Sequence, residues 1–475
     1  MREDAIPRWF SAGLVLVALA AIAATVAAPG AFRALPLLAP DSTSYLEWSP
    51  GRTPAYPVFL ALIRALSPDL GALGAAQLAI FLAAAVFCAT AHHRLYGHPV
   101  IALLVASAIM LHPQLVSYAF TALPELLFSA TLLVHVGCVF LALLSMRTRW
   151  YVMTGVTLAV LILLKPSGYA LVACMPALAL SARARPWRAM LATAVPLGAA
   201  LIAVSAVNLA RHGFFATQAQ GGYSLVAHVG AFVDAADPVT TAIAADARPQ
   251  RDAFRGAMTI DVYYLLTSHE YHALERIVRR RIVEDVERRQ GAPIADQRQF
   301  PSDARVLSEI TRAGTAIARR AILDHPRDYA RHVAAQLYGL WFLPLIQPPD
   351  GVARLNAALQ QIGSAVPGLA GGAVAFRSVP LPIFLAVRAL LALSLIAATV
   401  AIVLMVIRRT PATVATGYAG LALHANYVLV AAVQPGLPRY ALVMWPACVI
   451  VLAGCASLLI ERLRGDGMEP RQARL

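Results

Sequence analysis

Long runs of apolar residues with almost no charged side chains decide what this chain can fold into. Eight of the ten runs are about as long as the roughly 20 residues that a helix needs to cross the hydrocarbon core of a membrane, and two are shorter. Ten runs are found, at about 9–28, 70–91, 99–119, 124–145, 150–164, 167–181, 189–210, 389–407, 411–433 and 440–460. Only 13% of the 475 residues are charged, against roughly 25% in a soluble domain. We therefore expect an all-α polytopic membrane protein with about ten transmembrane helices, in a range of nine to twelve.

The short connections between these runs indicate the orientation. Basic residues lie in the loops 92–98, 146–150, 181–188 and 407–410 and in the tail 461–465. With both termini in the cytoplasm, all of these segments fall on the cytoplasmic side, as the positive-inside rule requires. The rule also accounts for the net charge of +14. We expect no nucleic-acid partner, because no basic face with interleaved aromatic residues is present.

Polar composition divides the chain into three parts. Residues 1–210 form a transmembrane core whose first outward loop, 30–69, is unusually polar. Residues 211–388 hold 16 of the chain's 25 acidic residues and are predicted to form a helical extracytoplasmic domain. A helix from 326 onward, with an apolar stripe at Tyr329, Val333, Leu337 and Leu340, is expected at the membrane surface. Residues 389–475 form the C-terminal transmembrane helices and a cytoplasmic tail.

Outside the tails and the external region only four acids remain: Asp41, Glu47, Asp69 and Glu125. All fall on the outer side, and charged groups near a bilayer are costly. Asp69 is explained as a residue at a helix start, and Glu47 as part of a hydrated loop. Asp41 is either an Asx-turn or cap for the following segment or a functional carboxylate. Glu125 either complements the dipole of the helix it begins or is functional.

The chain contains a single lysine, Lys165, at a Lys-Pro-Ser-Gly turn between the two shortest apolar runs. A lysine offers a compact point charge that suits a phosphate, but it could also reach the interface from a helix end. Arg52 and Arg439 lie on the same side. This set of cations and carboxylates fits chemistry on a phosphate-bearing lipid, in which cations neutralise the leaving phosphate and a carboxylate accepts a proton.

Other motifs are uninformative. No HExxH, GxSxG, Walker or GxGxxG pattern stands in its proper context. We interpret His112, His135 and His424, which lie in apolar runs, as core histidines. The five cysteines also lie in apolar runs and have no metal-ligand spacing.

Five segments together resemble the GT-C superfamily of membrane glycosyltransferases. They are PDSTSYLEWSPGRTPAYPVFLALI, TALPELLFSATLL, LLKPSGYALV, HPRDYARHVAAQLYGLW and PRYALVMWPACVIV, in the family's order. The resemblance is to the bacterial branch related to protein mannosyltransferases and to the aminoarabinose transferase of lipid A. It implies juxtamembrane helices in the first outward loop and a location in the bacterial inner membrane. It also implies inverting transfer of a sugar from a polyprenyl-phosphate carrier to a glycan, lipid or protein acceptor at the extracytoplasmic surface.

The resemblance also implies roles for residues. Asp41 would be the general base or position the acceptor, and Glu125 matches the acid that opens the fourth span. Lys165, Arg439 and Tyr440 match residues that hold the lipid phosphate. Arg52 is expected to contact the donor phosphate as well, and Tyr45 and Tyr56 to contact or position the acceptor.

Two departures from the family pattern affect these roles. Many relatives carry paired acids in the first loop, whereas Ser42 follows Asp41 here, so no cofactor is assigned and a divalent metal stays open. Lysine replaces the usual arginine at the short turn, which keeps the charge but loses the bidentate fork.

Two other functions compete with this interpretation. A polytopic transporter or lipid flippase would show repeats and charged residues near the membrane midplane, and neither is evident here. A non-catalytic envelope assembly protein could retain the fold and use its external region instead.

Overall fold

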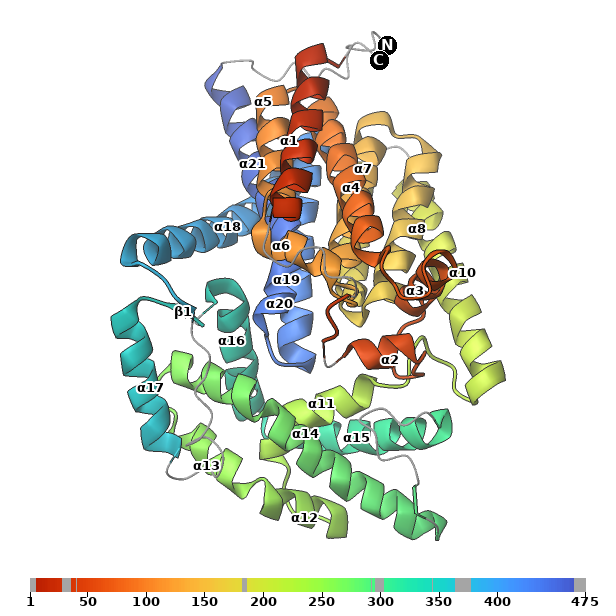
Figure 1. Cartoon of the computed structure of the whole chain (residues 1–475), viewed down its shortest axis with the longest axis vertical. Coiled ribbons are helices and arrows are strands. Elements are labelled where there is room, and N and C mark those ends of the chain that lie inside the picture. Colours follow the sequence, from red (N-terminus) through yellow and green to blue (C-terminus); the bar gives the residue numbers. More distant parts are fainter. Residues whose placement is uncertain are drawn as a thin grey trace.

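The computed structural model describes residues 6–27, 36–39, 41–181, 186–291, 293–294, 303–343, 345–363 and 377–464. The described chain is almost entirely helical (Figure 1). Its two strands, β1 (Ile346–Gln347) and β2 (Arg377–Ser378), are two residues long and pair in parallel. The helices form a bundle at one end of the molecule, and a second group of helices lies across the other end (Figure 1).

The bundle contains the helices that match the ten apolar runs. They are α1 (Arg8–Ala27), α4 (Leu73–Tyr96), α5 (Pro99–Met110), α6 (Pro113–Ser117), η1 (Tyr118–Phe120), α7 (Glu125–Ser145), α8 (Thr148–Leu164), η2 (Pro166–Cys174), α9 (Met175–Ser181), α10 (Pro186–His212), α18 (Leu381–Arg408), α19 (Pro411–Val433) and α21 (Trp445–Leu463).

Seven of the described helices are long and apolar enough to span a membrane: α1, α4, α7, α10, α18, α19 and α21. An eighth span results if α5 and the α6–η1 segment count together, although the pair is bent by 49°. The bend falls where His112 and Pro113 interrupt the helix, and proline cannot continue an α-helical hydrogen-bond ladder. The two remaining apolar runs form α8 and the η2–α9 segment, which are shorter. The expectation of an all-α polytopic membrane protein is confirmed.

Local signals explain where several of these helices begin and end. Helix α4 ends at Gly97, which adopts a left-handed φ of 75°, and Pro99 starts α5 two residues later. Glycine favours such a helix end and proline such a start. Helix α19 begins with a capping box between Thr410 and Thr413, with Pro411 as its first residue. Helix α7 is buried on nearly all sides and forms the centre of the bundle.

The loop between α1 and α4 contains two short helices, α2 (Ser42–Leu46) and α3 (Ala55–Leu66). They lie where the bundle meets the second group of helices (Figure 1).

The second group contains α11 (Gly221–Val229), η3 (Gly230–Phe232), α12 (Pro238–Asp246), α13 (Arg248–Gly256), α14 (Ile260–Gln290), α15 (Ala304–Asp324), α16 (Pro326–Phe342) and α17 (Pro349–Gly363). The long helix α14 contributes to two small apolar cores, one with α11 and α15 and the other with α13 and α17. We call α11–α17 the external helices, because they lie outside the bundle (Figure 1).

Helix α16 connects the external helices to the bundle. Leu340 and Trp341 belong to the large apolar core of the bundle, whereas Ala335 belongs to a core of the external helices. Val333 and Leu337 pack against the bundle core, and Tyr329 packs against the external core. The predicted apolar stripe thus divides between the two parts.

Candidate functional site

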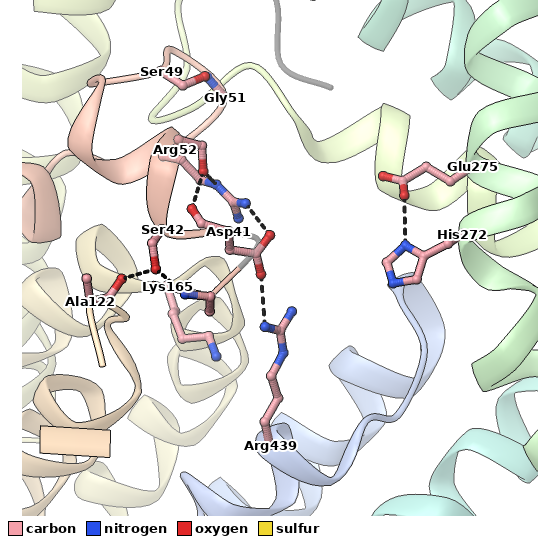
Figure 2. A network of polar contacts seen from close by, with 12 residues as sticks. Asp41, Ser42, Ser49, Gly51, Arg52, Ala122, Lys165, His272, Glu275 and Arg439 are labelled. Carbon is pink, nitrogen blue, oxygen red and sulfur yellow. Dashed lines mark hydrogen bonds and ion pairs between the residues drawn. The ribbon is translucent and has the colours of Figure 1, made fainter. Parts of the chain in front are cut away.

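Asp41 is held between two arginines that come from distant parts of the chain. Its Oδ1 atom lies 2.8 Å from Nη2 of Arg52, in the same loop, and its Oδ2 atom lies 2.9 Å from Nη1 of Arg439. Arg439 belongs to α20 (Pro438–Leu442), the short helix between α19 and α21. Figure 2 shows Asp41 lying between the two guanidinium groups. The fold thus brings these three side chains into contact.

Backbone pairing places Asp41 beside the start of α7. Leu37 forms a bridge with Thr121, through Leu37 N to Phe120 O and Ala122 N to Leu37 O. The Ser42 hydroxyl then donates to Ala122 O at 3.0 Å and accepts from Ala39 N. The loop is therefore fixed along the turn that leads into Glu125.

Asp41 precedes α2, but its side chain makes no capping hydrogen bond there. The interpretation of Asp41 as a helix cap or Asx-turn is wrong, because its two carboxylate oxygens are directed to the arginines instead. Burial raises the pKa of Asp41, but the charges and hydrogen bonds of Arg52 and Arg439 outweigh this effect and lower it to about 2. The carboxylate is ionised at neutral pH.

Arg52 is oriented by its own loop. Its Nε atom donates to the Ser44 hydroxyl at 2.8 Å, and that hydroxyl donates to the backbone oxygen of Asp41. The guanidinium lies 4.7 Å from the centre of the Tyr45 ring, a cation–π distance. The neighbouring Thr53 hydroxyl donates to Leu164 O, at the end of α8. The loop is thereby tied to the turn that carries Lys165.

Lys165 and Glu125 form a second, more deeply buried ion pair. The Nζ atom of Lys165 lies 3.1 Å from Oε1 of Glu125, and the two side chains are only 9% and 3% exposed. Glu125 is the first residue of α7, so the favourable interaction with the helix dipole and the pairing with Lys165 hold together. A buried charge is tolerated only with such a partner.

The Lys-Pro-Ser-Gly turn brings Lys165 to this position. Lys165 has an extended backbone between α8 and η2. Gly168 then approaches α8 so closely that a Cβ atom would lie 2.7 Å from Ile162 N. The Ser167 carbonyl accepts from Asn426 Nδ2 of α19. Only glycine fits at 168, because the η2 turn folds back directly onto the preceding helix.

Tyr440 joins the two ion pairs. The Lys165 Nζ atom lies 4.6 Å from the centre of its ring, and the Arg439 guanidinium lies 5.2 Å from it. Arg439 Nη2 also donates to the Tyr440 hydroxyl at 3.3 Å. The side chains of Asp41, Arg52, Arg439, Tyr440, Lys165 and Glu125 thus form one connected group, which we call the charged cluster.

The two predicted tyrosines of the first loop lie against this cluster. Tyr45 and Tyr56 pack edge to face, with ring centres 5.2 Å apart, and both are buried. The Arg52 guanidinium packs on the face of the Tyr45 ring, which helps to hold it in place. All eight site residues expected from the sequence are therefore brought together by the fold.

Three buried polar atoms around the cluster have no hydrogen-bond partner among the described residues. They are Arg439 Nε, Glu125 Oε2 and the Tyr56 hydroxyl. Buried polar groups are nearly always satisfied in native proteins, so each such exception needs an explanation. A ligand that bears oxygen atoms and hydroxyl groups could accept from Arg439 Nε, donate to Glu125 Oε2 and bond to the Tyr56 hydroxyl.

The carboxylates of the cluster are not arranged as ligands of a divalent metal ion. Both Asp41 oxygens accept from guanidinium groups, and Glu125 accepts from an ammonium group. Across the described ranges no group of three or more His, Cys, Asp and Glu side chains is arranged to hold a metal ion. The chemistry proposed below accordingly involves no metal ion.

The sequence did not indicate that α14 reaches the site. Tyr271 is close enough to the cluster that Asp41 and Tyr440 affect its titration; burial and the nearby Glu275 charge raise its pKa well above the usual value. Beside it, His272 Nδ1 lies 3.1 Å from Oε2 of the buried Glu275. Figure 2 shows this pair to the right of Asp41 and Arg439. No motif in the charged sequence of α14 could have identified these residues.

The three histidines of the apolar runs differ from one another. His135 is fully buried and hydrogen-bonded to Thr157 and Tyr418, as expected for a core histidine. His112 is half-buried and caps α6 by accepting from Leu115 N. His424 is also half-buried, with Nε2 3.3 Å from the Thr399 hydroxyl. For these two the core interpretation is wrong, because each lies at the edge of its helix packing.

Comparison with known proteins gives only distant matches. No protein-family model and no curated protein matches the chain. The crystal structure of the Archaeoglobus fulgidus oligosaccharyltransferase in the apo form matches at 13% identity and a TM-score of 0.40, over 96% of this chain and 51% of that one. The Archaeoglobus fulgidus oligosaccharyltransferase AglB in complex with an inhibitory peptide and a dolichol-phosphate matches at 12% identity and a TM-score of 0.39, over 98% and 52%. The chain thus spans about half the length of both, and at TM-scores below 0.5 the likeness carries no argument about activity.

Proposed function

We propose that the protein is a membrane glycosyltransferase that moves a sugar from a polyprenyl-phosphate carrier to an acceptor hydroxyl at the extracytoplasmic face of a bacterial inner membrane. The observation that carries this proposal is the Asp41 carboxylate held between Arg52 and Arg439. A carboxylate held by two guanidinium groups occupies a place that suits a phosphate, since arginine binds both groups through the same fork of N–H donors.

In the proposed reaction the acceptor oxygen attacks the anomeric carbon of the sugar. The bond from that carbon to the phosphate oxygen breaks, the polyprenyl phosphate leaves with both electrons of the bond, and the configuration inverts. Negative charge grows on the phosphate as it leaves. Arg439, Arg52 and Lys165 are the cations that would stabilise it, and Arg439 Nε still has a buried N–H group to offer.

The acceptor proton passes to Asp41 in this scheme. In the structure Asp41 is a weak base, because the two arginines hold its pKa near 2. A general base works best with a pKa nearer the working pH. When donor phosphate takes over hydrogen bonds from Arg439 and Arg52, the carboxylate loses its positive partners and its pKa rises. Donor binding would thus prepare the base.

Glu125 and the tyrosines have supporting roles in the proposal. Glu125 Oε1 holds Lys165 against the Tyr440 ring, while Oε2 is available to accept from a sugar hydroxyl. The Tyr56 hydroxyl is likewise without a partner in the described part of the chain and can bind an acceptor or sugar oxygen. The gathering of these groups on one side of the bundle favours surface chemistry over transport through it.

The test is a sugar-transfer assay in membranes that contain the full chain. Undecaprenyl-phosphate donors with radiolabelled hexoses or pentoses are supplied, and label released from the carrier onto an acceptor fraction is measured. We expect transfer with at least one donor, and its loss in Asp41→Asn. The matched control is Asp69→Asn, an exposed carboxylate that bonds only within its own turn, to Ser67 and Gly71. Equal transfer by Asp41→Asn and the wild type would overturn the assignment of the base.

A further inference from the structure

The turn that carries Arg439 is held by the external helices. Gly436 lies three residues before Arg439, and both of its backbone groups bond to external side chains. Its N–H donates to Gln336 Oε1 of α16 at 2.6 Å, and its carbonyl accepts from the Tyr264 hydroxyl of α14 at 2.9 Å. Gln336 and Tyr264 are both fully buried.

The two side chains that hold Gly436 are themselves fixed. Gln336 Nε2 donates to the Thr267 hydroxyl, and that hydroxyl donates to the backbone oxygen of Tyr264. The amide of Gln336 can therefore present only its oxygen to Gly436. Gln336, Thr267, Tyr264 and Gly436 form a closed circuit of hydrogen bonds, which we call the Gly436 clamp.

Close packing makes this clamp specific to glycine. A Cβ atom at Gly436 would lie 2.7 Å from Gln336 O and 3.0 Å from Leu340 Cγ. At Gly339 of α16, a Cβ atom would overlap the Tyr264 ring. The absence of both side chains lets α16 contact the turn on one face and the Tyr264 ring on another. In Figure 1, α16 lies beside α19 and α20.

The segment between Gly436 and Arg439 is stiff enough to transmit this position. Pro435 and Pro438 restrict the backbone on both sides of Gly436 and Leu437. Leu437 N donates to Pro435 O, and Tyr440 N donates to Leu437 O. A shift of Gly436 would therefore move Arg439 and Tyr440 together. Within the charged cluster, Arg439 contacts Asp41 and the Tyr440 ring contacts Lys165.

We propose that Gln336 and Tyr264 are positioning residues for donor binding, which act by fixing Gly436 and through it the Arg439 guanidinium. The inference rests on the proposed function, since it assigns the external helices a part in the same phosphate site. The external helices then set the geometry of the cation that meets the lipid phosphate.

The experiment measures binding of undecaprenyl phosphate to the full-length protein in nanodiscs, together with donor KM and kcat. Tyr264→Phe removes one hydroxyl, and Gln336→Met removes the acceptor at nearly constant volume. Tyr264→Phe loses one hydrogen bond, whereas Gln336→Met loses two, to the Gly436 N–H and to the Thr267 hydroxyl. We expect the dissociation constant and donor KM to rise about fivefold in Tyr264→Phe and by at least as much in Gln336→Met. At saturating donor, kcat should stay within about twofold.

The matched control is Tyr329→Phe. Its hydroxyl also donates from α16 to a backbone carbonyl, that of Ala432, but this carbonyl lies at the end of α19, outside the clamp. We expect wild-type affinity for this variant. A double-mutant cycle then separates positioning from general stability. In an Arg439→Ala background, Tyr264→Phe should cause no further loss of binding.

The possible outcomes distinguish this inference from the proposed function. If Arg439→Ala binds undecaprenyl phosphate as the wild type does, the phosphate site itself is wrong. If Arg439→Ala weakens binding while Tyr264→Phe and Gln336→Met do not, only the positioning role is overturned. Losses that add in the Arg439→Ala background also overturn it, because they indicate a purely structural effect.

Discussion

The Nη1 atom of Arg439 lies 2.9 Å from Oδ2 of Asp41, although the two residues come from opposite ends of the chain. The loop between α1 and α4 and the turn between α19 and α21 therefore meet at one carboxylate, and Tyr440 extends the contact to the buried Lys165–Glu125 pair. Asp41 contacts the same two guanidinium groups that the proposed donor phosphate would contact. This competition leads to the first prediction.

Replacing Asp41 with Asn should separate turnover from donor binding. We expect kcat to fall about 100- to 10,000-fold, because the proton acceptor is lost. Donor affinity should stay the same or increase, because no carboxylate then competes for Arg52 and Arg439. Steady-state kinetics with binding of undecaprenyl phosphate provides the check. Weaker donor binding by Asp41→Asn would mean that the carboxylate supports the site rather than competes for it.

Replacing Lys165 with Ala should weaken donor binding, in addition to the stability lost when its buried pair with Glu125 is broken. The variant removes a cation that lies against Tyr440 beside Arg439, so we expect the donor dissociation constant to rise roughly tenfold or more. Lys165→Arg keeps the charge and should retain most of the affinity. Titration with undecaprenyl phosphate at two salt concentrations measures both effects. An unchanged affinity in Lys165→Ala would remove this residue from the donor site.

The Lys165–Glu125 pair should show strong coupling in stability. Glu125→Gln leaves the Lys165 charge buried without its partner, and breaking a buried pair in this way costs about 3–5 kcal/mol. The double variant Glu125→Gln with Lys165→Met removes both charges and should recover much of that loss. Thermal unfolding of the wild type, the two single variants Glu125→Gln and Lys165→Met, and the double variant in one detergent gives the coupling energy. Additive losses would show that the pair is not energetically linked.

Gly168→Ala should destabilise the turn that carries Lys165. The new Cβ atom would lie 2.7 Å from Ile162 N, which cannot move without distorting α8. We expect a loss of about 1–3 kcal/mol, as for other cases of overpacking. Gly198→Ala in α10 is the matched control, because a Cβ atom there meets nothing within 4 Å. Unfolding temperatures that fall equally in both variants would contradict the close approach at Gly168.

Acid should destabilise the contact between the external helices and α19. His228 Nε2 lies 3.0 Å from Ala431 O, and His228 Nδ1 lies 3.3 Å from His332 Nε2. His228 therefore donates to Ala431 O and accepts from His332 Nε2–H, an arrangement that requires a neutral His228 ring. Burial lowers the pKa of His228 to about 4, and burial with the His228 charge lowers the pKa of His332 well below its usual value.

The sign of the pH dependence follows from these lowered pKa values. Near pH 6 the unfolded chain takes up protons that the folded chain rejects, so stability is complete above about pH 6.5 and falls below it. Each histidine contributes a slope of up to about 1.4 kcal/mol per pH unit. Unfolding temperatures between pH 7.5 and 4.5 measure the effect. His228→Gln should flatten the curve.

Much of the fold follows from the sequence because lipid imposes simple requirements. Each predicted apolar run is a helix or a broken helix, since backbone groups in a bilayer must be satisfied within the segment. The bend at His112 and Pro113 could not be predicted from hydropathy, because averaging over a whole run does not reveal a break of two residues. Scarcity of charge singled out Asp41, Glu125 and Lys165, because few charges are tolerated near lipid. The tyrosines carry no charge and could not be singled out in this way.

By itself the sequence determined the membrane class, the helices and which ionisable residues are out of place. Only the tertiary structure decided how these residues pair. Asp41 could equally have capped α2, and the choice of Arg52 and Arg439 depends on loops brought together by helix packing. The approach of α14 and α16 to Gly436 and the cluster left no mark in composition or periodicity. Such contacts join residues far apart in the chain, and only the packing of the complete fold specifies them.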